Sequence, residues 1–121
     1  MNVDSVNLRK KFDTFRDQWS PKIVAELNGQ YVKLVKFQGE FLWHHHDAED
    51  EMFLVAKGYF TMKFRDRDVV VGEGEMIVVP AGVEHKPVAE HECHVMLFEP
   101  ETTLNTGNVA NERTVRELER I

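Results

Sequence analysis

The sequence is poor in cysteine and in basic residues, and both shortages restrict what the protein can be. Cys93 is the only cysteine among 121 residues, so the chain can form neither an internal disulfide nor a zinc site built on several thiolates. Lys and Arg total 15 against 21 Asp and Glu, a formal net charge of −6. That balance argues against nucleic acid and against an anionic membrane as partners. We expect a protein of the reducing cytoplasm.

Long apolar runs are also missing from this sequence. The first 19 residues mix charged and apolar side chains, unlike a signal peptide or a membrane span. A hydrophobic fraction of 42% nevertheless suffices for a core, and 121 residues is the size of one domain. We therefore expect a single domain over 1–121. It would comprise an N-terminal helix at about 5–19, a core at about 22–100 and a polar tail at 101–121.

The apolar residues of the first segment follow a helical period. Leu8, Phe12, Phe15 and Trp19 are spaced 4, 3 and 4 apart, which places them on one helical face. Pro21 would end this helix, because the residue before a proline avoids helical dihedral angles. The helix is expected to cover the outside or one end of the core. Binding to a partner is the alternative.

From residue 22 to residue 98 the pattern changes to short strands separated by turn residues. Asn28-Gly29 is a strong signal for a two-residue hairpin turn between strands at 22–27 and 30–37. The remaining strands are expected at 41–46, 51–55, 59–65, 69–71, 75–79, 85–88 and 92–98. Such a series without intervening helices predicts an all-β sandwich or barrel. The polar tail would form loops or a short terminal helix at about 114–118.

Six histidines are present, and three of them are consecutive. In a strand, residues i and i+2 point to the same face, so His44 and His46 project together and His45 points away. Two such imidazoles can converge on one metal ion. Glu51 begins the next strand, and a carboxylate buried there needs a charged partner or a metal. A closed barrel could add His85 from a distant strand.

These two stretches resemble the two motifs of the cupin superfamily. The first motif is matched by His44, His46, Glu51 and Gly58, with Gly39 one residue closer than the usual spacing. The second is matched by Gly74, Pro80, Gly82 and His85, with Ala89 where the family has asparagine. The resemblance spans about 39–89 by motif and about 22–100 by strand pattern. It implies an all-β fold, a single-domain double-stranded β-helix (jelly-roll) barrel.

The resemblance also implies one divalent metal ion bound by His44, His46, Glu51 and His85. Imidazole and carboxylate ligands suit Mn, Fe, Co, Ni, Cu or Zn, and the ligand set alone does not distinguish these metals. Cupins include dioxygenases, isomerases, epimerases, lyases, decarboxylases and non-catalytic binding proteins, so the fold does not select the chemistry. Small cupins commonly form dimers, which implies a homodimer. Phe41 and Trp43 would lie opposite the ligands, in that interface or under the N-terminal helix.

Strand alternation predicts which side chains surround the metal. The expected pocket consists of Leu42, Phe53, Val55, Phe60, Met62 and Phe64. Lys63 and Arg65 would point outward, which leaves no secure inward base to bind a phosphate. We therefore expect a small, non-phosphorylated, partly apolar substrate that reaches the metal through oxygen atoms. A metalloenzyme is the first hypothesis. A binding protein with a structural or ligand-orienting metal and an interaction protein that uses the barrel surface are the alternatives.

The last strand leaves two interpretations open. Either the odd or the even residues of 93–98 face inward, and an inward His94 could act as an acid or base. Cys93 is expected to be a small buried side chain and not a nucleophile, because no activating partner is evident. The acidic residues after the histidine triplet are expected in a solvated turn, where one could orient a ligand histidine: Asp47, Glu49 and Asp50.

Overall fold

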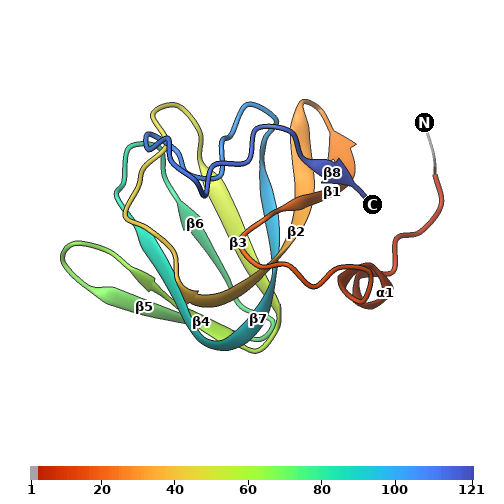
Figure 1. Cartoon of the computed structure of the whole chain (residues 1–121), viewed down its shortest axis with the longest axis horizontal. Coiled ribbons are helices and arrows are strands. Elements are labelled where there is room, and N and C mark those ends of the chain that lie inside the picture. Colours follow the sequence, from red (N-terminus) through yellow and green to blue (C-terminus); the bar gives the residue numbers. More distant parts are fainter. Residues whose placement is uncertain (1–2) are drawn as a thin grey trace.

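The computed structural model describes residues 3–121 of the chain. Its elements follow in the order α1 (Leu8–Phe12), β1 (Lys22–Leu27), β2 (Gln30–Glu40), β3 (Glu51–Lys57), β4 (Tyr59–Lys63), β5 (Asp68–Gly72), β6 (Met76–Val79), β7 (Lys86–Pro100) and β8 (Glu119–Arg120). Figure 1 shows the strands wrapping around one interior, with α1 outside it. This all-β barrel confirms the expected fold class. Among the described residues, no helix is long and apolar enough to cross a bilayer.

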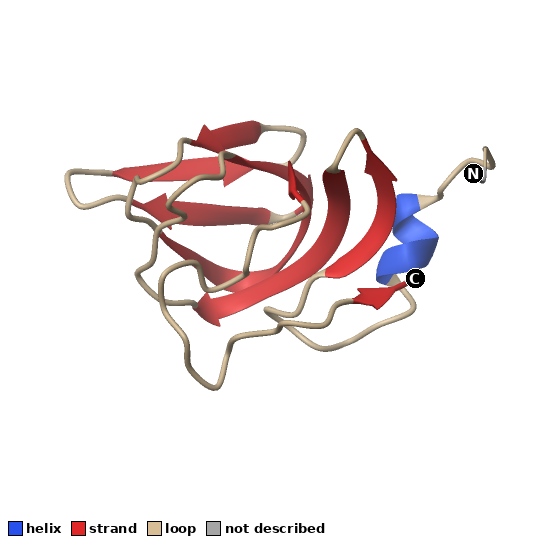
Figure 2. Cartoon of the chain, turned by 90° about the horizontal axis from the view of Figure 1, so that it is seen from above, coloured by secondary structure: helices blue, strands red, loops and turns tan. Residues whose placement is uncertain are grey.

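The long strand β7 organises the barrel. One of its edges pairs with β2 in antiparallel register, while the other edge pairs with β4 at residues 86–88 and with β3 at residues 94–98. β6 then pairs with β3, β5 with β4, and β1 and β8 extend the sheet beyond β2. Figure 2 shows the helix α1 outside the strands and close to the C-terminus. The two strands expected at 85–88 and 92–98 are therefore one. Its charged middle residues are exposed because they lie where the strand passes from one neighbour to the next.

The hairpin prediction is confirmed, whereas one expected strand is absent. Leu27 pairs with Gln30, and Asn28 and Gly29 between them have φ angles of 50° and 76°, as a type I′ turn requires. Residues 41–46 do not form a strand. Their only ladder contact is an isolated antiparallel bridge between His44 and His85, so this segment is irregular chain joined to the start of β7.

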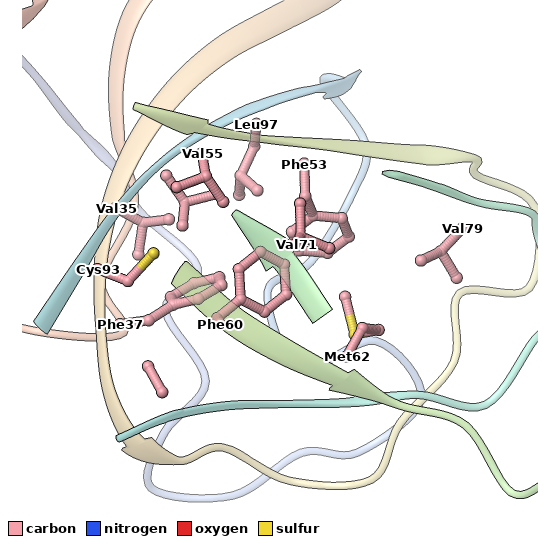
Figure 3. Close-up of a cluster of buried hydrophobic side chains, with 12 residues drawn as sticks. Val35, Phe37, Phe53, Val55, Phe60, Met62, Val71, Val79, Cys93 and Leu97 are labelled. Carbon is pink, nitrogen blue, oxygen red and sulfur yellow. The ribbon is translucent and has the colours of Figure 1, made fainter. Parts of the chain in front are cut away.

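The interior of the barrel is filled by apolar side chains from all the central strands (Figure 3). Cys93, Val95 and Leu97 face this core, which settles the orientation of β7. His94 consequently lies on the outer face, where its ring stacks on Phe12 at a centroid distance of 4.5 Å. An acid–base role for His94 inside the barrel is thereby excluded.

The N-terminal helix is shorter than the spacing predicted. α1 ends at Phe12, and Trp19 has a φ of 61°, outside the helical region. Phe12 and Phe15 still pack together on Leu34, so the segment covers the outer face of the barrel as expected. The tail has no helix either. Thr114, at the start of the expected helix, instead contacts the hydroxyl of Thr106 at 2.7 Å, which folds the tail back on itself.

Candidate metal centre

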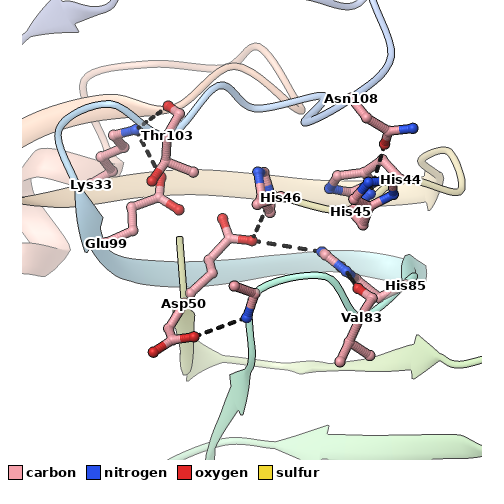
Figure 4. Close-up of polar contacts among 12 residues, drawn as sticks. Lys33, His44, His45, His46, Asp50, Val83, His85, Glu99, Thr103 and Asn108 are labelled. Atoms are coloured by element: carbon pink, nitrogen blue, oxygen red, sulfur yellow. Dashed lines mark hydrogen bonds and ion pairs between the residues drawn. The ribbon is translucent and has the colours of Figure 1, made fainter. Parts of the chain in front are cut away.

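Four ligand-type side chains meet at one end of the barrel interior (Figure 4). His44 and His46 come from the irregular segment after β2, Glu51 from the start of β3, and His85 from the residue before β7. All four are buried, and one ligand atom from each lies within 4.8 Å of the others. Glu51 Oε1 is 3.2 Å from His46 Nε2 and 3.6 Å from His85 Nε2. The structure thus brings together the four residues that the sequence singled out.

Backbone contacts aim the imidazoles at the shared centre. His44 Nδ1 lies 2.9 Å from the Leu42 carbonyl oxygen, and His85 Nδ1 lies 2.8 Å from the Val83 carbonyl oxygen. A Nδ1–H donated to a carbonyl leaves Nε2 as the atom free to bind a metal. The His44–His85 bridge, closed by backbone hydrogen bonds of 3.1 and 2.9 Å, holds the two segments in register.

The donor atoms in this cluster are buried without hydrogen-bond partners. Three atoms are buried and accept or donate no hydrogen bond: His46 Nε2, Glu51 Oε1 and His85 Nε2. Burying a polar atom without a partner costs free energy unless something binds the atom. A cation with nitrogen and oxygen ligands would bind all three at once. The donor set therefore fits a divalent transition metal.

Electrostatics favour the protonation states that bind metals. Burial, and then the positive charge that His85 can carry, lower the pKa of His44 to about 4. Burial alone would raise the pKa of Glu51, but the close approach of the Glu99 carboxyl and of the His46 and His85 imidazoles brings it well below its usual range. A neutral imidazole and an ionised carboxylate are the forms that coordinate a cation.

A buried ion pair lies behind the cluster, and no pattern in the sequence predicted it. Lys33 Nζ is 2.7 Å from Glu99 Oε1, and both side chains are only 1% exposed. Glu99 follows Leu97 in the inward set of β7, so the alternation would have found it once the orientation of β7 was known. Burial, and then the neighbouring charge of Glu51, raise the pKa of Glu99 well above its usual range. Lys33 is thus an inward base, contrary to expectation, but its Nζ is already bound to the Glu99 carboxyl.

The C-terminal tail holds the histidine segment in place. His45 N donates to Asn108 Oδ1 at 2.8 Å, and Asn108 N donates to the His45 carbonyl at 3.0 Å. Gly107 lies directly against this segment. A Cβ on Gly107 would overlap the His45 carbonyl and lie 3.1 Å from His44 Cδ2. The tail, expected to form loops or a short terminal helix, therefore forms one wall of the centre.

A cavity with a volume of about 30 Å³ opens beside the cluster. It reaches two candidate ligands and is otherwise mostly apolar. Its lining consists of Trp19, Pro21, Val35, Phe37, Phe41, His44, Glu51, Phe53, Pro87, Leu97 and Asn105. The cavity thus faces β2 and the N-terminal segment and not β4.

The expected pocket residues have different positions. Phe53 lines the cavity, whereas Val55, Phe60 and Met62 are buried in the barrel core. Leu42 and Phe64 are half-buried, and neither lines the cavity. Alternation identified side chains that face inward, but the inward side chains of β4 fill the core and do not line the cavity.

The two aromatic residues expected opposite the ligands also separate. Phe41 lines the cavity and contacts the His44 ring edge-on at 5.5 Å, on the ligand side, because residues 41–46 lack the strict alternation of a strand. Trp43 instead lies under the guanidinium of Arg65, at 3.8 Å from Cζ to the ring centroid.

The polar residues around the histidine triplet have structural partners. His45 turns away from the cluster, and its Nε2 lies 2.8 Å from Asp47 Oδ1. Asp50 accepts a hydrogen bond from Ala81 N at 2.9 Å, and Glu49 accepts one from Thr102 Oγ1 at 2.9 Å. None of these carboxylates has a hydrogen bond to a candidate ligand histidine in the described structure.

Comparisons with known proteins agree with this geometry. A family model described as "Cupin domain" matches residues 31–107. The crystal structure of a cupin-2 domain containing protein from Shewanella frigidimarina NCIMB 400 is 47% identical, with a TM-score of 0.79 over 79% of this chain and 94% of that one. Protein NMB1881 from Neisseria meningitidis is 31% identical, with a TM-score of 0.74 over 81% of this chain and all of that one.

One further relative is similar to this chain by sequence comparison. The uncharacterized protein YdbB of Bacillus subtilis is 34% identical over 64 residues. That match covers 52% of this chain and 57% of YdbB, so it spans little more than half of either protein.

Proposed function

The chain belongs to the cupin family, and on that premise we propose that it binds one divalent transition-metal ion through His44, His46, Glu51 and His85. We further propose that it is an enzyme acting on a small, non-phosphorylated substrate that bears oxygen atoms. The observation that carries this proposal is the set of buried donor atoms that lack any hydrogen-bond partner. When bound, the metal would supply Lewis-acid or redox chemistry at this centre.

The cavity supports the substrate class. Neither lysine nor arginine lines it, and the buried Lys33 is occupied by Glu99. A phosphate would therefore meet no available cation among the lining residues. The apolar rings and aliphatic groups suit a partly apolar molecule that presents oxygen atoms toward His44 and Glu51.

The same lining restricts the chemistry. Its only titratable residues are His44 and Glu51, and both are candidate ligands. A reaction that needs a separate general acid or base finds none there, so catalysis would depend on the metal centre itself. This favours dioxygenase or metal-assisted lyase and isomerase reactions without a dedicated proton carrier. It also supports a second candidate function, a small-molecule binding protein in which the metal orients the ligand.

Metal binding is tested with matched histidine variants. His46→Ala removes a candidate ligand, whereas His45→Ala removes the neighbouring imidazole that points away. We expect calorimetry with Mn²⁺, Co²⁺, Ni²⁺ and Zn²⁺ to show one site per chain in the parent and in His45→Ala, and none in His46→Ala. Elemental analysis of protein purified without chelator then identifies the metal. Equal affinity in all three proteins would contradict the proposal.

Catalysis and binding are separated by the fate of the ligand. Metal-loaded protein is incubated with a panel of small hydroxy- and keto-acids, with and without oxygen, and the mixtures are analysed by mass spectrometry. Turnover by the parent and none by His46→Ala supports an enzyme. Saturable binding with the ligand recovered unchanged supports the binding protein.

We also propose that the chain forms a homodimer in a reducing cytoplasm. The outer face of β3, β6 and β7 carries an apolar patch, in which Met52 is paired with Val78 and Phe98, and Leu54 with Met76. Met76 and Val78 are 53% and 51% exposed, and β6 pairs with β3 alone among the described strands. A second copy placed about a two-fold axis would cover this patch and the open β6 edge. The unpaired Cys93 supports the compartment.

The dimer is tested by the mass of the protein in solution. We expect Met76→Lys to turn the dimer into a monomer in analytical ultracentrifugation. Val70→Lys serves as the control because Val70, on β5, is 64% exposed but lies outside the patch. A monomeric parent, or dissociation by both substitutions, would contradict this assignment of the interface.

A further inference from the structure

The cavity beside the candidate metal centre is lined in part by a residue that lies outside the family match. Trp19 lines the cavity, whereas the family model begins at residue 31. Its indole stacks on Phe37 at 4.5 Å and on Phe41 at 4.8 Å, between centroids. Phe41 in turn contacts the His44 ring. A single aromatic ring therefore separates Trp19 from a candidate metal ligand.

The backbone holds Trp19 in an unfavourable conformation. Its φ of 61° lies in the left-handed region, which a bulky side chain rarely adopts. Two hydrogen bonds maintain it: Trp19 N donates to the Lys36 carbonyl at 2.9 Å, and Nε1 donates to the Gln38 carbonyl at 2.8 Å. Backbone strain of this kind persists only where surrounding contacts offset its cost, and strained residues cluster at functional sites. Here the strained residue forms a wall of the cavity.

Because the cavity is small, the position of the Trp19 indole affects which molecules can enter it. A volume of about 30 Å³ holds one or two water molecules and not a ring. The other walls come from barrel strands, their flanking segments and the tethered tail. Asn105, on the tail side, is fixed by its Nδ2 donating to the Arg113 carbonyl and its Oδ1 accepting from Val115 N, both at 2.9 Å. Trp19 is only half-buried and comes from a segment without regular structure.

We propose that Trp19 is the specificity-determining residue of this cavity, whose indole limits substrates to those with only a few atoms beside the metal. This inference rests on the proposed function, since it concerns the same site. Replacing the indole by a smaller side chain would enlarge the cavity toward Phe41 and Phe37. Bulkier substituents would then be admitted without any change in the candidate ligands.

The first experiment measures access in metal-free protein and does not depend on the proposed function. Diethyl pyrocarbonate carbethoxylates accessible imidazoles, and peptide mapping gives the rate at His44 relative to the exposed His91. We expect Trp19→Leu to raise this ratio by about tenfold. The matched Trp43→Leu variant, which removes the other indole from a position outside the cavity, should leave it unchanged. Equal ratios in all proteins, or an equal rise in both variants, would overturn the inference.

The second experiment uses Co²⁺-loaded protein and two chelating probes that differ in one ring. Absorption titrations give the affinities for acetohydroxamate and benzohydroxamate. We expect Trp19→Leu to bind benzohydroxamate about tenfold more tightly than the parent, with little change for acetohydroxamate. Parallel changes for both probes would contradict the inference. Failure of all proteins to bind Co²⁺ would contradict the proposed function instead, while the access experiment still decides the role of Trp19. If Trp19→Leu does not fold, Trp19→Phe is used in both experiments.

Discussion

Lys33 and Glu99 form an ion pair of 2.7 Å that is almost completely excluded from solvent. Glu99 also lies beside Glu51, so two carboxyl groups and one ammonium group share a buried region behind the candidate metal centre. Removing one member of a buried pair leaves an uncompensated charge, which is more costly than replacing both. The pair is therefore best tested by a double-mutant cycle.

Lys33→Met should destabilise the protein by about 3–5 kcal/mol, because Glu99 then stays buried beside Glu51 without a cation. The double variant Lys33→Met/Glu99→Gln should recover much of this loss, since its buried groups carry less charge. Urea unfolding followed by circular dichroism measures the free energy of unfolding of the parent, of each single variant and of the double variant. Additive effects of the two substitutions would show that the pair contributes no coupling.

Gly107→Ala should destabilise the protein more than Gly39→Ala does. Both glycines have positive φ, 57° and 80°, so each alanine adds about 1–2 kcal/mol of backbone strain. At Gly39 nothing lies within 4 Å of an added Cβ, whereas at Gly107 the Cβ meets the His45 carbonyl. We expect an additional loss of at least about 1 kcal/mol at Gly107. Chemical denaturation of both variants gives the comparison, and equal losses would mean that the tail moves aside freely.

Metal should stabilise the folded protein. At a free metal concentration of one hundred times Kd, binding adds about 2.7 kcal/mol, which should raise Tm by roughly 10 °C for a chain of this size. Differential scanning calorimetry with and without a chelator measures the shift. Glu51→Gln should lose most of the shift, whereas the exposed His91→Ala should retain it. A chelator-insensitive Tm in the parent would contradict metal binding at this centre.

Cys93 should resist thiol reagents in the native protein. Its side chain is fully buried, and burial raises the pKa of its thiol from 9.0 to about 12. The thiolate that reacts is therefore scarce as well as inaccessible at pH 8. Labelling with iodoacetamide should be slow in buffer and fast in denaturant, as followed by mass spectrometry. Rapid native labelling would indicate local opening of β7.

The raised pKa of the Cys93 thiol also predicts how the stability of the protein changes with pH. Because the folded-state pKa is raised, the contribution of Cys93 to stability is complete below about pH 9 and declines as the pH rises toward 12. Cys93→Ala should therefore lose less stability than the parent between those values. Urea unfolding at pH 8 and pH 10 provides the comparison.

Local features of this chain were readable from the sequence because their causes are local. Asn28-Gly29 predicted its turn, since positive φ at both positions depends on those two residues alone. Strand alternation predicted that His45 points away from its two neighbours. The residues named as ligands lie together, and their binding of a metal stays a proposal.

Helix extent was less predictable, because a spacing pattern does not register competing contacts. The period of Phe12, Phe15 and Trp19 suggested one long helix, but the backbone of Trp19 bonds to β2 and leaves the helical region. In the same way, alternation correctly placed Phe60 and Met62 inside the barrel and could not tell core from cavity.

The sequence by itself determined the barrel class, the hairpin and the identity of the clustered imidazoles and carboxylate. Only the tertiary structure decided that Lys33 pairs with Glu99, that Gly107 and Asn108 hold the histidine segment, and that Trp19 lines the cavity. The physical reason is that periodicity specifies the face on which a side chain lies. Which faces and loops then meet depends on how distant segments pack, and no local pattern records that.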